Sequence, residues 1–258
     1  MNGAARRDEI LRMVRRKGYV SVSEAAQALG VDTSTVRRDL ARLDHLGLVE
    51  RSHGGALPVR DEDDIPFDVK MGRLVPEKQA IGRLAASLVP DGAAMILDSG
   101  STSLMVAQAL AGHRDLTVIT PDIRVAAELI TRPDVRLIVP GGEGVASTTT
   151  VVSQEAVESM RRFHVDVAVM GADAVDVDGA TNMNGTVIPL KRAMLGAARR
   201  AVLVMDSSKF GVRRLVKVAP LDQFDEIVTD DGLAEEIARA YPVPVRRAPV
   251  AREGQVPA

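Results

Sequence analysis

The hydrophobic positions of the first sixty residues repeat with a helical period. The apolar side chains of residues 6–17 fall on one helical face, and Gly18 ends this run. A short second helix is predicted to end at Gly30, and a third is predicted over residues 33–46, where Gly47 follows. This part of the chain is therefore predicted to form three helices joined by short connections.

The pattern then changes to that of a β-hairpin. Residues 48–51 and 56–59 are short strand-like runs on either side of Ser52-His53-Gly54-Gly55, which is a turn signal. At the start of the second helix, Ser21 and Glu24 have capping-box spacing, in which each side chain satisfies a free amide of the other residue. Helix, helix, helix and hairpin thus occur in that order.

Beyond residue 75, apolar runs alternate with amphipathic helical stretches. Strands are predicted at residues 93–97, 116–119, 135–139, 165–170, 201–205 and 226–229. Helices are predicted near residues 77–88, 102–110, 123–130, 154–163, 189–198 and 233–240. This alternation favours a mainly parallel, Rossmann-like α/β sheet covered by helices. The predicted organisation is a domain at 1–58, a linker at 59–75, a second domain at 76–247 and a disordered tail at 248–258.

Composition excludes several classes of protein. Of 258 residues, 46% are hydrophobic, which suffices for a core and excludes wholesale disorder. The apolar stretches are far shorter than the roughly 18 residues of a membrane span, and the N-terminus lacks the apolar run of a signal peptide. The absence of Cys excludes disulfides and thiolate metal sites. We therefore expect a soluble, cytoplasmic protein with no membrane partner, no metal and no cofactor.

Charge is distributed unevenly along the chain. Residues 1–60 carry 11 Lys and Arg against 7 Asp and Glu, whereas the remainder carries 22 against 28, which together give the net charge of −2. A basic end on an acidic chain favours an anionic partner for that end. Ordinary scatter accounts for the same numbers equally well, so motifs have to decide.

The second and third helices, joined by Gly30-Val31-Asp32, form a helix-turn-helix pattern, with Asp32 placed to cap the third helix. If Val36, Leu40 and Leu43 face inward, hydroxyl and guanidinium groups suited to the major groove of double-stranded DNA face outward. Asp39 is expected to orient an arginine, because DNA would repel its charge. The candidate DNA contacts are Ser21, Thr33, Ser34, Thr35, Arg37, Arg38 and Arg42, together with Arg51 and His53 on a hairpin that would act as a wing. The alternative is a helical interaction module with a solvated charged face.

In the second domain, small and polar residues follow the predicted strands. Asp98-Ser99-Gly100-Ser101-Thr102 lies between a strand and a helix start, where free amides and hydroxyls suit a phosphate, although a tight turn is the plainer alternative. The loops at Thr120 and at Gly141-Gly142 would lie at the same carboxyl edge of the sheet. Asp173 and Asp176 could accept hydrogen bonds from sugar hydroxyls or only cap their loop, and Lys191 and Lys209 could neutralise a phosphate.

Both parts of the chain resemble the DeoR family of bacterial transcriptional regulators. In the first domain, the resemblance rests on Tyr19–Glu24, Leu29-Gly30-Val31, Thr35-Val36-Arg37-Arg38-Asp39-Leu40 and Gly47–Ala56. In the second, it rests on Glu77-Lys78, Asp98–Thr102, Gly141-Gly142, Gly171–Asp176, Lys191–Met194 and Asp206–Gly211. The resemblance implies a winged helix-turn-helix DNA-binding domain and an effector domain related in fold to ribose-5-phosphate isomerase. It also implies a phosphorylated sugar or related metabolite as effector.

Three positions depart from the family pattern. Pro121 replaces a common Asn, Ser153 replaces a Gly, and the stretch around Val187 lacks the acidic residue that often precedes the Lys-Arg pair. An isomerase needs a general base, and that carboxylate would be the natural candidate.

We therefore expect a one-component repressor that assembles as a dimer or tetramer on operator DNA and is not an enzyme. The alternatives are a sugar-phosphate isomerase or deaminase with a DNA-binding head, and a dinucleotide sensor, which the absence of G-x-G-x-x-G after the first strand makes weak.

Overall fold

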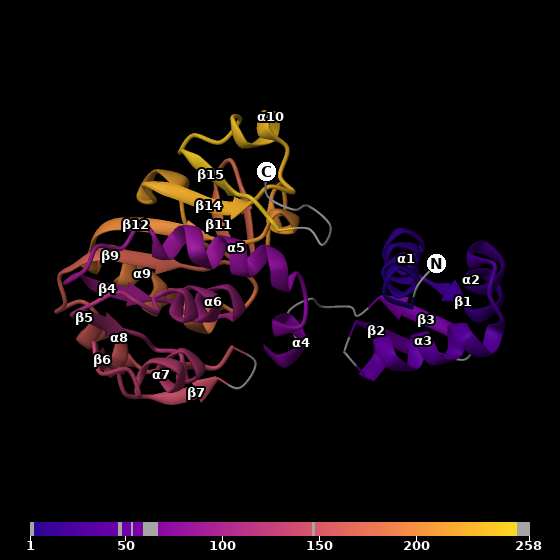
Figure 1. Ribbon diagram of the computed structural model, residues 1–258, viewed down its shortest axis with the longest axis horizontal. Helices are drawn as coiled ribbons and strands as arrows, with labels where there is room; N and C mark the ends of the chain where they lie inside the picture. Colours follow the sequence, from indigo (N-terminus) through magenta and orange to yellow (C-terminus); the bar gives the residue numbers. More distant parts are fainter. Residues whose placement is uncertain (1–2, 46–47, 53, 59–66, 146–147, 252–258) are drawn as a thin grey trace. The chain divides into compact units, whose positions relative to one another are not determined.

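The computed structural model describes residues 3–45, 48–52, 54–58, 67–145 and 148–251. The chain divides into two compact units, residues 1–70 and 71–258. Both units are shown in Figure 1. Among the described residues, no helix is long and apolar enough to span a membrane.

The first unit contains the predicted helices and hairpin. Its elements are α1 Gly3–Lys17, β1 Val20–Ser21, α2 Val22–Leu29, α3 Thr33–His45, β2 Val49–Ser52 and β3 Gly55–Pro58. The strands form a sheet in the order β1-β3-β2, so the two-residue strand β1 adds to the outer side of the predicted hairpin. Helix α4 Phe67–Met71 follows along the chain.

The helix boundaries of this unit follow from its caps. The Ser21 side chain accepts a hydrogen bond from the Glu24 amide at 3.1 Å, and Gly30 ends α2 in the left-handed conformation. A hydrogen bond from Lys17 lowers the pKa of Glu24, with a smaller contribution from the Ser21 amide, which is the direction that the predicted capping box requires. Asp32 directly precedes α3, and its carbonyl accepts hydrogen bonds from the amides of Thr35 and Val36.

The second unit is built on a seven-stranded sheet. Its strands are β4 Ala94–Leu97, β5 Leu116–Ile119, β6 Val135–Ile138, β9 Val165–Met170, β12 Ala198–Val204, β14 Glu226–Asp230 and β15 Val245–Ala248. All pairs in this sheet are parallel, in the order β15-β14-β12-β9-β4-β5-β6. The six strands predicted from apolar runs all lie in it, and β15 was not predicted.

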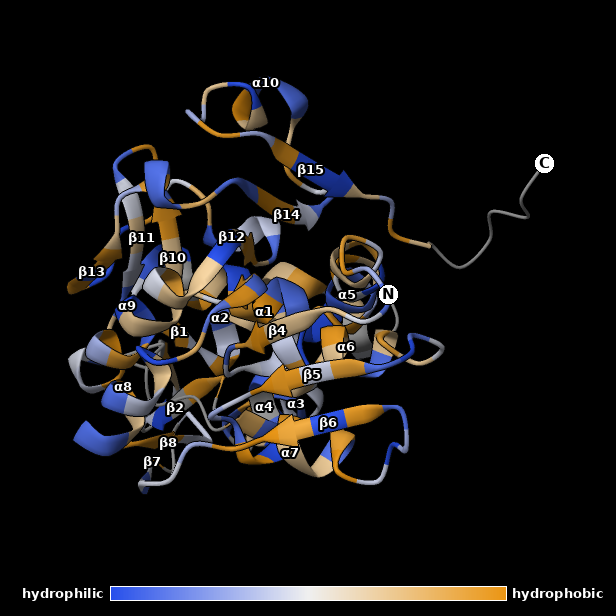
Figure 2. Cartoon of the chain, turned by 90° about the vertical axis from the view of Figure 1, so that its left-hand side faces the viewer, coloured by the Kyte–Doolittle hydropathy of each residue, from blue (hydrophilic) through white to orange (hydrophobic). Residues whose placement is uncertain are grey.

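Helices cover both faces of the sheet. They are α5 Val75–Ala86, α6 Ser101–Ala109, α7 Ile123–Leu129, α8 Gln154–Met160, α9 Ile188–Ala197 and the short α10 Glu235–Ala238. Helices α5 and α6 lie on one face and α9 on the other (Figure 1). In Figure 2, β4 and much of β6 are coloured hydrophobic, and the core residues Ile96, Ala168 and Leu203 of the central strands are fully buried. A parallel sheet buried on both faces reads as nearly continuous apolar runs, which is why the periodicity identified its strands.

Two small antiparallel sheets extend the second unit. One contains β7 Glu143–Val145 and β8 Thr150–Val152, and the other contains β10 Ala174–Asp176, β11 Gly179–Asn182 and β13 Val216–Ala219. The expected loop at Gly141-Gly142 therefore leads into a hairpin before α8 begins, and does not pass directly into a helix. Short turns of 3₁₀-helix occur at η2 Gly185–Val187, η3 Ser207–Lys209 and η4 Leu221–Gln223.

Candidate functional sites

Helix α3 has the two faces that the sequence predicts. Val36, Leu40 and Leu43 are fully buried in the core of the first unit. The opposite face exposes Thr33, Ser34, Arg37, Arg38 and Arg42, and Thr35 is half-buried. This face presents hydroxyl and guanidinium groups on a continuous helix, which is the chemistry needed for contacts with phosphates and base edges in a major groove.

Asp39 ties this helix to α1. Its Oδ2 accepts a hydrogen bond from Arg6 Nε at 2.6 Å, and its Oδ1 lies 3.6 Å from Arg7 Nη1. The predicted role of Asp39, orienting an arginine, is confirmed. The arginines come from α1, whereas the neighbouring Arg38 contacts Thr35 Oγ1 at 3.5 Å. The exposed face of α3 is therefore supported from the opposite side by a buried carboxylate.

The hairpin β2–β3 presents Arg51 to solvent. Arg51 pairs with Ala56 across the hairpin, and its amide donates to Asp44 Oδ1 at 3.2 Å. His53, the other predicted wing residue, lies outside the described residues. Ser21 is half-buried, and its hydroxyl oxygen is engaged in capping α2. The structure thus explains Ser21 by a local role, and its contact with DNA stays a prediction.

In the second unit, residues 98–102 form the candidate anion-binding loop, called the anion loop below. It lies where the strand order of the sheet reverses. From β4 the chain proceeds to β5 and β6 on one side of the sheet, whereas β9 leads to β12, β14 and β15 on the other. Strands β4 and β9 are neighbours, so the loops that follow Leu97 and Met170 lie side by side at the carboxyl edge. Ligands of open α/β sheets bind at such a switch point.

Asp98 and Lys191 form a buried ion pair at this switch point. Their side chains are 1% and 5% exposed. Asp98 Oδ2 also accepts the Gly171 amide at 2.9 Å, and Lys191 Nζ donates to the Gly171 carbonyl at 2.9 Å. The pair links the end of β4, the loop after β9 and helix α9. The charge of Lys191 is therefore already compensated by Asp98, which bears directly on its predicted role beside a phosphate.

The anion loop has a glycine in a conformation that other residues rarely adopt. Gly100 precedes α6 with φ of +120°, and a Cβ atom built there would meet no atom within 4 Å, so open space lies in front of it. Ser99 is half-buried, and its carbonyl accepts the Ser103 hydroxyl at 3.3 Å. Ser101 and Thr102 are buried in the first turn of α6, whose amides have no intrahelical acceptors.

Lys209 reaches this region from the loop after β12. Asp206 caps the 3₁₀ turn η3, which contains Lys209. Lys209 Nζ donates to the Ala172 carbonyl at 3.0 Å. Ala172 follows Gly171, whose amide donates to Asp98. No ion pair involves Lys209 in the part of the chain that the structure describes. Lys209 is thus a half-buried lysine beside the loop after β9, and its contact with an effector stays a prediction.

The two predicted acidic residues after β9 serve different contacts. Asp173 Oδ2 accepts the Met183 amide at 3.1 Å. Asp176 ends β10, where its Oδ1 accepts the amides of Asp178 and Gly179 and its Oδ2 accepts Arg213 Nε at 2.6 Å. Burial raises the pKa of Asp176, but the hydrogen bonds, led by that from Arg213, outweigh it and hold the pKa below its ordinary value. These are the turn-capping contacts that the sequence left as an alternative.

The loop after β5 contains a buried carboxylate that was not among the predicted site residues. Thr120 is fully buried, and its hydroxyl accepts the Asp122 amide at 3.2 Å. Asp122 is also fully buried and accepts the Gly100 amide at 3.0 Å and the Thr149 hydroxyl at 2.8 Å. Its position before an apolar helical stretch signals an N-cap, but no local pattern signals the contacts with residues 22 and 27 positions away.

The glycines after β6 lie beside the β7–β8 hairpin. Gly141 is exposed, and its carbonyl accepts the Ser153 hydroxyl at 3.3 Å. Gly142 has φ of +144°, and a Cβ atom there would lie 2.9 Å from the Val152 carbonyl group. Close packing against β8 therefore explains Gly142 without a ligand. Binding of an effector by either glycine stays a prediction.

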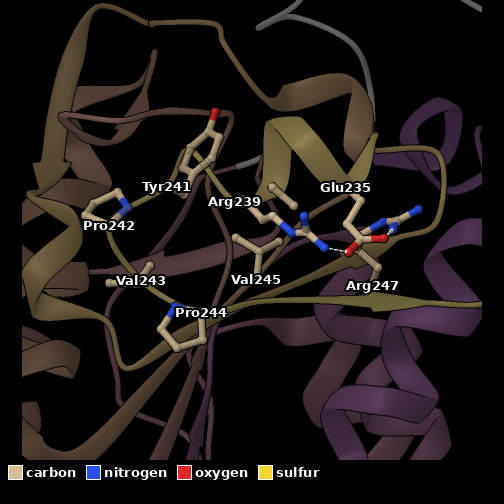
Figure 3. A pocket seen from close by; sticks show the side chains of 9 residues that line it. Glu235, Arg239, Tyr241, Pro242, Val243, Pro244, Val245 and Arg247 are labelled. Carbon is tan, nitrogen blue, oxygen red and sulfur yellow. Dashed lines mark hydrogen bonds and ion pairs between the residues drawn. The ribbon is translucent and has the colours of Figure 1, made fainter.

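A separate pocket lies at the C-terminal end of the described chain. Figure 3 shows Tyr241, Pro242 and Val243 on one side of it and Glu235 with Arg239 and Arg247 on the other. None of the predicted effector residues lines this pocket. Within the described residues, no cluster of three or more His, Asp or Glu side chains is arranged to hold a metal ion.

Comparisons with known proteins match both units. The DeoR C-terminal sensor domain family matches residues 74–231, and the DeoR-like helix-turn-helix domain family matches residues 6–61. The uncharacterized HTH-type transcriptional regulator YgbI of Escherichia coli K12 is 37% identical over 236 residues, which cover 91% of this chain and 92% of that protein. The glycerol-3-phosphate regulon repressor of the same strain is 30% identical over 231 residues, which cover 89% and 92%.

Among solved structures, ribose 5-phosphate isomerase A from Neisseria gonorrhoeae is similar, with a TM-score of 0.38 and 20% identity over 54% of each chain. The expected likeness to this isomerase is thus found, but one so weak carries no argument about function.

Proposed function

The chain belongs to the DeoR family of DNA-binding transcriptional regulators, and from this premise we propose that it represses a carbohydrate-metabolism operon under the control of a phosphorylated sugar or polyol. Residues 1–58 would bind the operator in the cytoplasm, residues 76–247 would bind the effector, and residues 59–75 would join them. The observation that carries the effector assignment is the loop at Gly100, which lies at the switch point with open space before it and Lys209 nearby. The name of one relative, the glycerol-3-phosphate regulon repressor, supports a phosphorylated ligand of small size.

In this proposal the residues at the switch point have distinct roles. The first-turn amides of α6, with the hydroxyls of Ser101 and Thr102, bind the phosphate, and Lys209 neutralises part of its charge. Asp98 and Lys191 hold the loop as a compensated pair. Asp173, beside the loop after β9, is the candidate acceptor for a sugar hydroxyl.

Titration of the protein with a panel of sugar and polyol phosphates by calorimetry tests the effector site. Lys209→Ala should weaken the binding of the effector so identified by about 1.5–3 kcal/mol, the usual contribution of a hydrogen bond to a charged group. Lys217→Ala, an exposed lysine of the same unit, is the matched control and should bind as wild type does. Gly100→Val, which adds bulk at the open side of the loop, should abolish binding. If the Lys209 and Gly100 variants both respond at wild-type effector concentrations, this loop is not the site.

Operator DNA selected from a random library provides the corresponding test of the DNA-binding face. Arg37→Ala and Arg38→Ala should each weaken operator binding by about 1–3 kcal/mol at matched salt, through loss of a base or phosphate contact. Arg12→Ala on α1 is the control, because Arg12 is exposed and pairs with Glu9 one turn away on the same helix. Unchanged affinity in both α3 variants would contradict the assignment.

We further propose that the protein acts as a homo-oligomer, a dimer or a tetramer, through its second unit. One helix-turn-helix reads a half-site, which is too little for typical specific affinity. Large exposed hydrophobic residues occur mainly in the second unit and include Ile123, Ile130, Val139, Val177 and Leu215, whereas Tyr19 represents the first unit. Light scattering that shows a monomer at micromolar concentration, with full operator affinity, would contradict this.

The second unit is proposed to bind its effector without converting it. An aldose–ketose isomerase needs a general base over the substrate carbon. Val187 is a buried aliphatic residue in the stretch where relatives often carry an acid, and the carboxylate of Asp176 is bound by Arg213. NMR spectra of each sugar phosphate incubated with the protein should show no product, and steady conversion would favour the enzyme alternative.

A further inference from the structure

One buried carboxylate joins three loops at the carboxyl edge of the sheet. Asp122 Oδ1 caps α7 by accepting the amides of Arg124 at 2.7 Å and Val125 at 3.1 Å. Its Oδ2 accepts the Gly100 amide at 3.0 Å from the anion loop and the Thr149 hydroxyl at 2.8 Å from the β7–β8 hairpin. The loop after β4, the loop after β5 and the hairpin after β6 therefore meet at a single oxygen atom.

The hairpin is attached to the loop after β5 next to this oxygen. The Ile123 amide donates to the Thr149 carbonyl at 3.0 Å, and the Val151 amide donates to the Pro121 carbonyl at 2.8 Å. Thr149 has φ of +57°, a conformation that a β-branched residue rarely adopts. Its hydroxyl lies 2.8 Å from Asp122 Oδ2 and 2.7 Å from the Thr148 carbonyl, and its single proton serves one acceptor at a time. Donation to Asp122 helps to hold Thr149 in place, so loss of that contact should loosen the attachment of the hairpin.

A phosphate at the anion loop would disturb this arrangement. It would place negative charge next to Gly100, whose amide Asp122 already holds, so the phosphate and the carboxylate would repel one another. Desolvation by burial raises the pKa of Asp122, which the hydrogen bonds from Gly100, Thr149, Val125 and Arg124 only partly oppose. The carboxylate therefore has few other ways to compensate its charge once a donor is drawn away.

We propose that Asp122 is a positioning residue that couples occupation of the anion loop to release of the β7–β8 hairpin. Phosphate at the anion loop repels the Asp122 carboxylate and displaces it, which lengthens its contacts with both Gly100 and Thr149. The hairpin then separates more often from the loop after β5. Such coupling gives the sensor two arrangements with different ligand affinities, which any effector response requires. This inference rests on the phosphate site of the proposed function.

Hydrogen exchange of the Ile123 and Val151 amides tests the coupling, with inorganic phosphate as the probe and calorimetry to measure its binding to the full-length protein. Saturating phosphate should speed exchange at these amides about fivefold in wild type, as expected for loss of roughly one hydrogen bond. In Asp122→Asn, exchange should be fast without phosphate and should not respond to it. Asp225→Asn is the matched control. Asp225 directly precedes β14, and its carboxylate accepts the amide of Ala201 in β12, so this variant should behave as wild type.

Substitutions at Thr149 keep the test decisive if the Asp122 variant does not fold. Thr149→Ala should raise the basal exchange and lose the response while still binding phosphate, and Thr149→Ser, which keeps the hydroxyl, should restore both. Phosphate binding to wild type without faster exchange would overturn the coupling and leave the proposed site standing. Failure of wild type to bind phosphate or any sugar phosphate would instead overturn the proposed site, and the coupling with it.

Discussion

Replacement of Lys191 by Met tests whether this lysine balances a buried charge or awaits a phosphate. Methionine has a similar length but no charge, so Asp98 would remain buried with the Gly171 amide as its described donor. Asp98 Oδ1 already has no hydrogen-bond partner within the described residues, and the carboxylate therefore depends heavily on Oδ2. Breaking a buried pair by removal of one partner typically costs about 3–5 kcal/mol. For a unit of this size, each kcal/mol lowers Tm by roughly 2–4 °C, which gives a loss of roughly 6–20 °C.

Calorimetry of the full-length protein measures this loss, and the transition of the first unit serves as an internal control. Lys217→Met, an exposed lysine of the same unit, should change stability by less than about 0.5 kcal/mol. The double variant Asp98→Asn with Lys191→Met should recover much of the loss, because no buried charge remains. A loss below about 1 kcal/mol for Lys191→Met would refute the reasoning, because the pair would then behave as an exposed one and Lys191 would be free to serve a ligand.

The remaining predictions concern the DNA-binding unit and acid stability. Gly55→Ala should disrupt the pairing of β1 with β3 and weaken operator binding, because the new Cβ would lie 2.3 Å from the Val20 carbonyl oxygen. An operator affinity and a melting temperature equal to those of wild type would contradict this. Asp39→Ala should destabilise the first unit by about 1.5–3 kcal/mol through loss of charge-assisted hydrogen bonds to α1, measurable by urea unfolding, whereas an unchanged midpoint would argue against the contact. Because the folded-state pKa of Asp176 is lowered, its pairing with Arg213 stabilises the protein above the unfolded pKa of about 3.9 and is lost as the pH falls through the folded pKa. Arg213→Ala should therefore lower stability slightly near neutral pH and not at all in strong acid, and a cost independent of pH would exclude this origin.

The parts of the fold that could be predicted are those in which burial and backbone pattern coincide. Residues 116–119 and 165–170 match β5 and β9 residue for residue, because strands buried on both faces consist of apolar runs. Strand β11 could not be found in this way, because Gly179–Asn182 contains no β-branched apolar residue although all four residues are buried. Strand β15 carries Arg246 and Arg247, which is typical of an edge strand and removes the apolar signal.

The sequence predicts which residues of the candidate site lie at strand ends, but not which distant residues contact them. Strand ends bring Asp98 and Gly100 to the carboxyl edge whatever surrounds them, so their location followed from the alternation of strands and helices. The role of a charged side chain depends instead on the groups within about 3–4 Å of it, and those can come from anywhere in the chain. Lys191 and Lys209 looked equivalent in sequence, but an aspartate 93 positions away neutralises the first, and the second meets a backbone carbonyl. Asp122 went unrecognised for the same reason, since its N-cap position is local and its contacts with Gly100 and Thr149 are not. A sensor loop therefore has to be assigned from the charge partners of its residues, and by that criterion Lys209 is a better candidate than Lys191 for the proposed contact with an anionic effector.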